Sequence, residues 1–342
     1  MPRLMLSARR LAVLTIVFVA LVAWRLWPRQ PATTQLSGKT MGTTWSVRAV
    51  GVRDEQAARQ AVATALDAVD QAMSTWKPNS ELSRLNQHAG PEPFTLSVAT
   101  REVLQVSAEV SALSGGAFDV TVGPLVDAWS FGPKGAQPAP SDEQIADLLA
   151  WVGAGQLRLD DAGVTKADPR VRVDLSAVAK GYGVDRAANA LESLGVTRYL
   201  VEVGGELRVR GLNGDGEHWK VGVERPDPAG RAVQRVVPLT DAALATSGDY
   251  RNFYERDGKR LSHTIDPRSG RPIEHALASV TVVDSTCARA DALATALNVL
   301  GPQAGLALAR REKLSAWFLV RQPDGGLGES GTGLFDPRKE QP

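Results

Sequence analysis

The spacing of hydrophobic residues along the chain changes between the helical period and the strand period. Val62, Leu66, Val69 and Met73 share one face within residues 54–76, which predicts an amphipathic helix. The same period predicts further helices over residues 98–113, 141–153, 178–194, 290–301 and 303–312. Short runs rich in β-branched and aromatic residues predict strands over residues 43–50, 118–122, 171–174, 199–203, 206–210, 219–224, 235–239, 251–255, 260–265, 279–283 and 314–320.

Turn and capping signals connect these segments. Ser141 and Gln144 have the spacing of a capping box at a helix start. The Gly-Gly pair at 204–205 and the Asp-Gly pair at 257–258 predict tight hairpin turns between neighbouring strands. Hairpins and helices alternate without regular strand–helix–strand units. We therefore expect an α+β fold with largely antiparallel pairing, rather than a doubly wound parallel sheet.

The N-terminal segment has the pattern of a membrane-targeting sequence. Residues 11–24 are apolar and uncharged, and they directly follow Arg9 and Arg10. The run is shorter than the ~20 residues of an unkinked span, and a buried core helix is the alternative. We expect residues 1–30 to be an uncleaved signal anchor with its N-terminus in the cytoplasm, followed by a polar linker over residues 31–38.

Composition and charge narrow the class of protein. The chain has 342 residues, a length typical of about two domains, and its 43% apolar and 23% charged residues exclude wholesale disorder. The net charge of +1 combines an arginine-rich N-terminus with a body of about −4, which argues against a nucleic-acid-binding face. Cys287 is the sole cysteine, which excludes an internal disulfide and a multi-cysteine metal site.

Residues 173–185, VDLSAVAKGYGVD, predict an anion site. A predicted strand ends at Asp174, and Lys180 lies among glycines at a helix start. Unpaired backbone N–H groups at a helix start favour anions, and a lysine adds a positive charge. The alternative is an ordinary strand–turn–helix with a solvated lysine.

Residues 290–301 predict a cation site. Asp291 and Thr295 are four positions apart and therefore share one helix face. A carboxylate and a hydroxyl are oxygen ligands that suit Mg²⁺, completed by a carbonyl, water and a substrate phosphate. The alternative is that Asp291 caps the helix and Thr295 packs in the core.

Two further groups of residues are candidates for substrate contacts. His263, on the predicted strand 260–265, is a candidate proton acceptor or phosphate contact, although a strand histidine is also common as a structural residue. Met41, Trp76 and Phe118 offer surfaces for a flat ring. Trp76 also continues the apolar stripe of its helix, so core packing is its alternative. Asp119 is a candidate contact for a ligand hydroxyl or ring nitrogen, or a turn cap.

Eight segments, in this order, resemble one family. KTMGTTW, STWKPNSELSRLN, GGAFDVTVGPLV, VDLSAVAKGYGVD, VEVGGELRVRG, SGDYRNFY, SHTIDPRSGRPI and ADALATAL are similar to the ApbE family of FAD:protein FMN transferases. The resemblance extends from about residue 38 to residue 321. It implies one T-fold-like α+β catalytic unit, of one or two lobes, over residues 39–322, with a C-terminal tail over residues 323–342.

The resemblance also implies a set of site residues. It assigns the metal to Asp291, Thr295 and the main-chain oxygen of Ala177. Trp76 stands where relatives often have tyrosine, and Ala294 stands where some relatives have a second acid, which leaves fewer metal contacts. The implied FAD contacts are Met41, Trp76, Ala117, Phe118, Asp119, Asp174, Lys180 and Ile265.

The resemblance implies a Mg²⁺-dependent enzyme that acts outside the cytoplasmic membrane. It attaches FMN from FAD to a Thr or Ser hydroxyl of an acceptor flavoprotein, such as a subunit of a membrane redox complex, and releases AMP. We expect an inner-membrane protein whose catalytic body faces the periplasm. An FAD pyrophosphatase that releases FMN and AMP and a non-enzymatic FAD carrier are the alternative functions.

Overall fold

The computed structural model describes residues 32–226, 230, 232–248, 253–256 and 259–339. Its centre is an eight-stranded sheet in which every neighbouring pair is antiparallel. In spatial order the strands are β1 (Thr33–Thr40), β2 (Thr43–Val50), β5 (Tyr199–Val203), β6 (Glu206–Arg210), β9 (Ala242–Gly248), β14 (Leu277–Asp284), β15 (Ser315–Arg321) and β16 (Leu327–Gly331).

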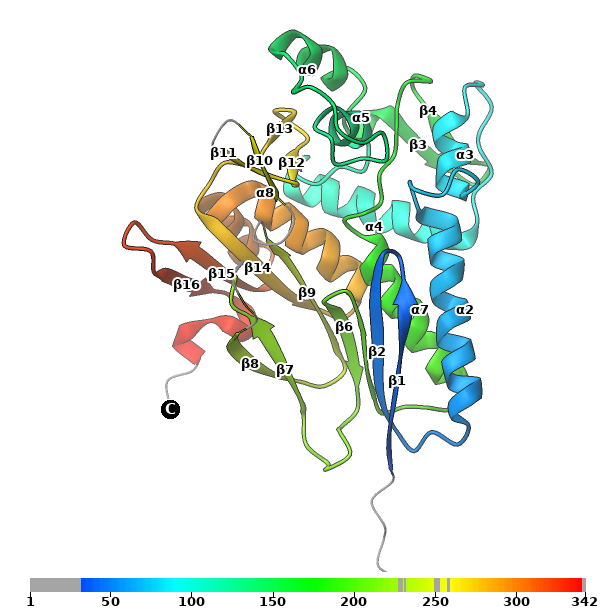
Figure 1. Ribbon diagram of the computed structural model, residues 1–342, viewed down its shortest axis with the longest axis vertical. Helices are drawn as coiled ribbons and strands as arrows, with labels where there is room; N and C mark the ends of the chain where they lie inside the picture. The colour runs from blue at the N-terminus through cyan, green and yellow to red at the C-terminus, as the bar shows by residue number, and fades with distance from the viewer. Residues whose placement is uncertain (1–31, 227–229, 231, 249–252, 257–258, 340–342) are drawn as a thin grey trace, which may run out of the picture.

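The described helices lie mainly on one face of this sheet (Figure 1). They are α2 (Glu55–Met73), α3 (Glu81–Gln87), α4 (Val98–Ser114), α5 (Gly123–Ala128), α6 (Asp142–Leu149), α7 (Ala179–Ser193) and α8 (Cys287–Arg311), with short 3₁₀ turns η1 (Ala154–Gln156), η2 (Gly333–Phe335) and η3 (Pro337–Lys339). The α+β fold predicted from the sequence is therefore confirmed.

Four two-stranded hairpins complete the fold. They are β3 (Leu157–Asp160) with β4 (Gly163–Lys166), β7 (Trp219–Glu224) with β8 (Val233–Leu239), β10 (Phe253–Arg256) with β11 (Lys259–Ser262), and β12 (Ile265–Asp266) with β13 (Arg271–Pro272). The β7–β8 hairpin covers the sheet face opposite the helices (Figure 1), where Trp219 and Val237 pack against Leu207 and Trp317. A separate small apolar cluster joins α5, α6 and β12 through Leu125, Trp129, Ile145 and Ile265.

The helix predictions hold to within a few residues. The capping box of Ser141 and Gln144 is present at α6, and the Gly-Gly turn at 204–205 joins β5 to β6 with Val203 opposite Glu206. Gly301 interrupts α8 with a non-helical backbone, so two helices run end to end there, as predicted. Within the described residues, α8 is the single helix long and apolar enough to cross a membrane, and it packs as a core helix.

Several predictions of strands and linkers are wrong. Residues 118–122 and 171–174 form no strands; a single parallel bridge joins Val122 to Arg172. The expected linker contributes its residues 33–38 to β1, and the expected tail contributes β16. His263 lies in a bend between β11 and β12 rather than on a strand. The predicted anchor over residues 1–30 and the turn at 257–258 lie outside the described residues.

Candidate functional site

A pocket of about 650 Å³ lies between the central sheet and the small apolar cluster. The β5–β6 turn, the start of α7, α8 and the bend before β12 contribute to its wall, together with β7 and β9. Eight of the predicted site residues line it although they are far apart in the sequence: Trp76, Asp174, Ala177, Lys180, His263, Ile265, Asp291 and Thr295.

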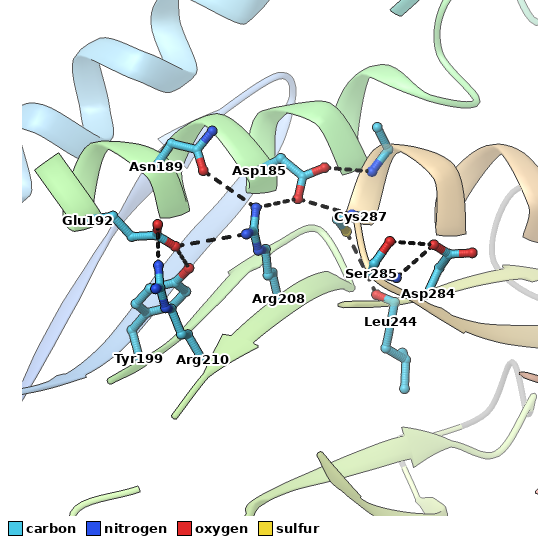
Figure 2. A network of polar contacts seen from close by, with 11 residues as sticks. Asp185, Asn189, Glu192, Tyr199, Arg208, Arg210, Leu244, Asp284, Ser285 and Cys287 are labelled. Carbon is cyan, nitrogen blue, oxygen red and sulfur yellow. Dashed lines mark hydrogen bonds and ion pairs between the residues drawn. The ribbon is translucent and has the colours of Figure 1, made fainter. Parts of the chain in front are cut away.

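Two helices, α7 and α8, begin close to each other, and each receives a carboxylate from the other. Their own N-cap residues, Val178 and Thr286, make no side-chain capping bond. The Gly181 N–H near the start of α7 instead donates to Asp291 Oδ2 at 3.0 Å. The N–H groups of Cys287 and Ala288 at the start of α8 donate to Asp185 at 3.1 and 2.9 Å (Figure 2). This exchange satisfies backbone donors that helix starts leave unpaired.

Gly181 allows this close approach of the two helices. A Cβ atom at this position would stand 2.3 Å from the Cys287 carbonyl oxygen and 2.8 Å from Asp291 Cβ. Since a backbone atom is involved, no side-chain rotation relieves the overlap. The glycine therefore determines how closely Asp291 approaches the start of α7.

Asp291 and Thr295 form an oxygen pair one helical turn apart on the pocket side of α8. Asp291 is 6% exposed, and its Oδ1, like the Thr295 hydroxyl, has no hydrogen-bond partner among the described residues. Ala177, whose carbonyl is the implied third ligand, lines the same pocket. The alternative predicted for Asp291 is half right, because it caps a helix start, but that of α7 rather than its own.

Lys180 is paired with a second carboxylate in the pocket. Its Nζ lies 2.7 Å from Glu206 Oε1, and a third of the lysine side chain stays exposed. Burial alone would lower the pKa of Lys180, but the charges of Glu206 and Asp291 outweigh it and raise that pKa. Lys180 is therefore a fixed ammonium group at the pocket wall, not the solvated lysine of the alternative.

Trp76 and His263 contribute ring surfaces to the pocket. α2 ends at Met73, so Trp76 leaves the helix stripe and is 67% exposed; core packing is therefore wrong for this residue. The His263 ring stands edge-on to Phe131, with 6.4 Å between the ring centroids. Ile265 beside it is buried in the small apolar cluster and also lines the pocket.

Four predicted contacts lie away from this pocket. Ala117 and Phe118 are buried, and Met41, in the β1–β2 turn, packs beside Gly183 of α7. Asp119 accepts hydrogen bonds from the Thr121 N–H at 2.8 Å and the Thr121 hydroxyl at 2.6 Å, so it stabilises its own turn. It also lines a second, more open cavity of about 430 Å³.

The sequence pattern does not indicate two buried acids, Glu206 and Asp185. Glu206 and Arg208 alternate with apolar residues on β6, a pattern typical of a half-exposed strand, but both side chains reach α7. Asp185 was visible only as the last residue of the VDLSAVAKGYGVD segment. The local sequence does not indicate that a helix packs over β6. The ion pairs between α7 and β6 therefore could not be predicted from it.

Asp185 and Arg208 belong to an extended polar network (Figure 2). Arg208 Nη1 lies 3.1 Å from Asp185 Oδ1 and 3.5 Å from Asn189 Oδ1. Glu192 accepts from the Tyr199 hydroxyl at 2.5 Å and forms an ion pair with Arg210. The network ties β5 and β6 to α7 and, through Asp185, to the start of α8.

The sequence and the fold match a known group of enzymes. The model of the ApbE family matches residues 41–318. A relative from Vibrio cholerae, named FAD:protein FMN transferase, is 44% identical over 307 residues, which cover 88% of this chain and 91% of the relative. A relative of the same name from Escherichia coli is 44% identical over 299 residues, 85% of each chain.

Solved structures agree with the family match. The flavin transferase ApbE from Vibrio cholerae superposes with a TM-score of 0.82 at 42% identity, over 90% of this chain and 99% of the other. The apo form of the Pseudomonas stutzeri flavinyl transferase ApbE also gives 0.82, at 39% identity, over 90% and 96%. The chain belongs to the ApbE family.

Proposed function

We propose that this protein is an FAD:protein FMN transferase. The observation that carries the proposal is one pocket in a chain of the ApbE family, where the oxygen pair Asp291 and Thr295 lies beside the Lys180 ammonium. Metal-ligand oxygens next to a fixed positive charge suit a diphosphate. The names of relatives that align along about nine-tenths of their own length support the same activity.

In this proposal the flavin and the phosphates occupy different parts of the pocket. The exposed Trp76 ring and the apolar Ile265 offer surfaces for the isoalloxazine ring. Lys180 contacts the diphosphate. Asp174, which also lines the pocket, is a further contact. The resemblance assigns Met41, Ala117, Phe118 and Asp119 to FAD as well, but these residues do not line this pocket.

Mg²⁺ is the proposed metal. Asp291 Oδ1, the Thr295 hydroxyl and the Ala177 carbonyl would hold it, and an all-oxygen donor set fits this cation. When bound, it would neutralise charge on the diphosphate. Asp291 Oδ2 is already fixed by the Gly181 N–H, so the protein orients the carboxylate in advance.

The reaction transfers the whole FMN group, through its phosphorus, to a protein hydroxyl. The oxygen of an acceptor Thr or Ser attacks the phosphorus on the flavin side, the bond to the AMP phosphate breaks, and AMP leaves. His263 lies in the pocket wall and would accept the hydroxyl proton or contact the phosphates. Lys180 stabilises the negative charge on the phosphate oxygens.

The direct test follows the flavin and AMP together. The full chain in detergent is incubated with FAD, Mg²⁺ and a candidate acceptor flavoprotein, and the intact mass of the acceptor and free AMP are measured. We expect one FMN added to the acceptor for each AMP released. Free FMN with AMP would instead identify a pyrophosphatase, and recovery of intact FAD alone would identify a carrier.

The role of His263 has its own test. His263→Ala should reduce transfer across the pH range 6 to 9, because the variant lacks the imidazole that accepts the proton or contacts the phosphates. Transfer by the variant is compared with wild type at each pH. Unchanged transfer at every pH would remove His263 from the mechanism.

We also propose that residues 1–30 anchor the enzyme in the inner membrane with its catalytic body in the periplasm. The apolar run over residues 11–24 behind Arg9 and Arg10 supports this orientation. The acceptor would then be a flavoprotein that exposes its hydroxyl on the same side, such as a subunit of a membrane redox complex. Extraction of the full chain at alkaline pH tests the anchor, because an integral protein stays with the membrane fraction.

A further inference from the structure

Glu206 is a buried carboxylate with one oxygen left unpaired. The residue is 4% exposed, lines the pocket, and directs Oε1 to Lys180 Nζ at 2.7 Å. Its other oxygen, Oε2, is buried and has no hydrogen-bond partner among the described residues. Buried polar atoms in folded proteins are nearly always paired, so an unpaired carboxylate oxygen at a pocket wall indicates a group retained for the pocket.

The backbone fixes Glu206 at this place. It is the first residue of β6, directly after Gly204 and Gly205, whose φ angles of +62° and +112° favour glycine. The Gly205 N–H donates to Glu202 Oε1 at 2.8 Å, which secures the turn. A Cβ atom on Gly204 would stand 3.6 Å from Lys180 Cδ, so the lysine stem runs along this turn. The turn therefore holds the methylene stem of Lys180, and Glu206 holds its ammonium group.

The charges around Lys180 explain why a second carboxylate is useful. Burial raises the pKa of Glu206, the Lys180 charge opposes this rise, and the Asp291 charge adds to it. The charges of Glu206 and Asp291 both raise the pKa of Lys180, so both acids act on the same ammonium group. Once a cation occupies Asp291, Glu206 is the remaining acid that attracts Lys180. An ammonium group has three donors, and Glu206 uses one, which leaves two for phosphate oxygens.

We propose that Glu206 is a positioning residue for the transfer reaction: it holds the Lys180 ammonium beside Asp291, where the ammonium meets the diphosphate of FAD. This inference rests on the proposed function, because it takes FAD as the ligand. The proposal predicts that the contributions of Lys180 and Glu206 to FAD affinity are coupled. Each residue should contribute only while the other is present.

A double-mutant cycle on FAD affinity tests this coupling. The FAD Kd is measured by flavin fluorescence with Mg²⁺ and without acceptor for wild type, Glu206→Ala, Lys180→Met and the double variant. Loss of a hydrogen bond to a charged group predicts that each single variant raises the Kd by about tenfold. The double variant should bind no more weakly than Lys180→Met, because Glu206 acts through the lysine. Additive losses, or an unchanged Kd in Glu206→Ala, would overturn the proposal.

Two further variants keep the test independent of folding. Glu206→Gln keeps an acceptor for Lys180 but loses the charge, so it should raise the Kd by about threefold, less than Glu206→Ala. If the alanine variant does not fold, the cycle is run with Glu206→Gln. Glu192→Ala removes a carboxylate of the same strand–helix interface outside the pocket and should leave the Kd unchanged. A Kd increase equal to that of Glu206→Ala would show a general effect of the interface and overturn the proposal.

The outcome is distinguishable from failure of the proposed function. A wild-type chain that binds FAD with the coupling above, but adds no flavin to any acceptor, would contradict the transferase and leave the role of Glu206 standing. A wild-type chain that transfers FMN, with Lys180 and Glu206 contributing independently, would support the transferase and remove the role of Glu206.

Discussion

Two of the ion pairs that join α7 to β6 have opposite polarity. In one, the helix supplies Asp185 and the strand supplies Arg208; in the other, the helix supplies Lys180 and the strand supplies Glu206. Glu206 and Arg208 are two residues apart on β6 and therefore lie on one face of the strand. The two pairs thus share the same elements.

The pairs differ in how completely their atoms are satisfied. Both oxygens of Asp185 accept hydrogen bonds, from Arg208 and from the first N–H groups of α8 (Figure 2). Glu206 keeps Oε2 unpaired, and Lys180 keeps a third of its side chain exposed to the pocket. We infer that the Asp185–Arg208 pair stabilises the fold and that the Lys180–Glu206 pair is held ready for a ligand. Mutations of the first pair should therefore lower stability, and mutations of the second should lower FAD affinity.

The largest effect is expected on the pocket side, from Asp291→Ala. Removal of the carboxylate eliminates a proposed metal ligand and should abolish FMN transfer, a loss of at least about 100-fold. The measurement is transfer to the acceptor as a function of Mg²⁺ concentration. Transfer at the wild-type rate in magnesium-free buffer would contradict the assignment.

Asp185→Ala should have the largest effect on stability. It leaves Arg208 without its carboxylate and the start of α8 without its cap, and breaking such a buried pair costs about 3 kcal/mol of unfolding free energy. Urea unfolding measures the loss. Asp185→Asn, which can still accept from one of the two α8 N–H groups, is the control and should lose less. Equal stability of the alanine variant and wild type would contradict the structural role.

Gly181→Ala should connect the two regions. The added methyl group would press on the Cys287 carbonyl and force α7 and α8 apart, at a cost of about 2 kcal/mol. Because Asp291 hydrogen-bonds to the Gly181 N–H, transfer should fall together with stability. The control is Gly195→Ala, at a position after the end of α7 where a Cβ meets no atom within 4 Å but the positive φ still strains alanine. If Gly181→Ala and Gly195→Ala lose the same stability and neither loses transfer, the close approach of the helices is unimportant.

Trp76→Ala should have the smallest effect. The side chain is 67% exposed, so the unfolding free energy should stay within about 0.5 kcal/mol of wild type. FAD affinity should fall by about tenfold if the ring stacks on the flavin, and Trp76→Phe should recover most of it. Flavin fluorescence quenching measures both variants. A large loss of stability in Trp76→Ala would instead show that Trp76 has a structural role.

The sequence predicts the described helices of eight or more residues, but not α3 and α5, because the signals of the longer helices are local. The apolar stripe of α2, the Ser97 cap and left-handed Gly115 around α4, and the capping box of α6 are all formed by residues close in the sequence. The edge strand β1 was missed because its pattern is mostly polar, with Leu36 as its buried apolar residue. It becomes a strand because β2 pairs with it along its whole length.

In the two segments that were wrongly predicted as strands, side chains form hydrogen bonds that a neighbouring strand would otherwise form. Asn86 donates to the Val173 carbonyl at 2.8 Å and accepts from its N–H at 2.7 Å, which takes both groups that a neighbouring strand would use. Asp119 accepts from the Thr121 N–H in the same manner. These bonds depend on residues elsewhere in the fold or on turn geometry, so the hydrophobic pattern could not reveal them.

The individual residues of the candidate site could be predicted from the sequence, but the contacts between them could not. Asp291, Thr295 and Lys180 follow from helix spacing and the resemblance, and the structure brings them to one pocket. The pairing of Lys180 with Glu206 and the exchange of caps between α7 and α8 require knowledge of which helix packs on which strand. Such contacts link residues 26 and 110 positions apart in the chain.

Strand β1 has a consequence for where the reaction can take place. Its first residue, Thr33, follows the apolar run over residues 11–24 after only eight residues, a tether of at most about 28 Å. Its far end leads into the turn before Thr43, about 27 Å further along the strand, and Thr43 lies beside Gly204 near the Lys180 stem. If residues 1–30 anchor the chain as proposed, these two lengths would limit the distance between the pocket and the bilayer. Acceptors would have to present their hydroxyl within that reach.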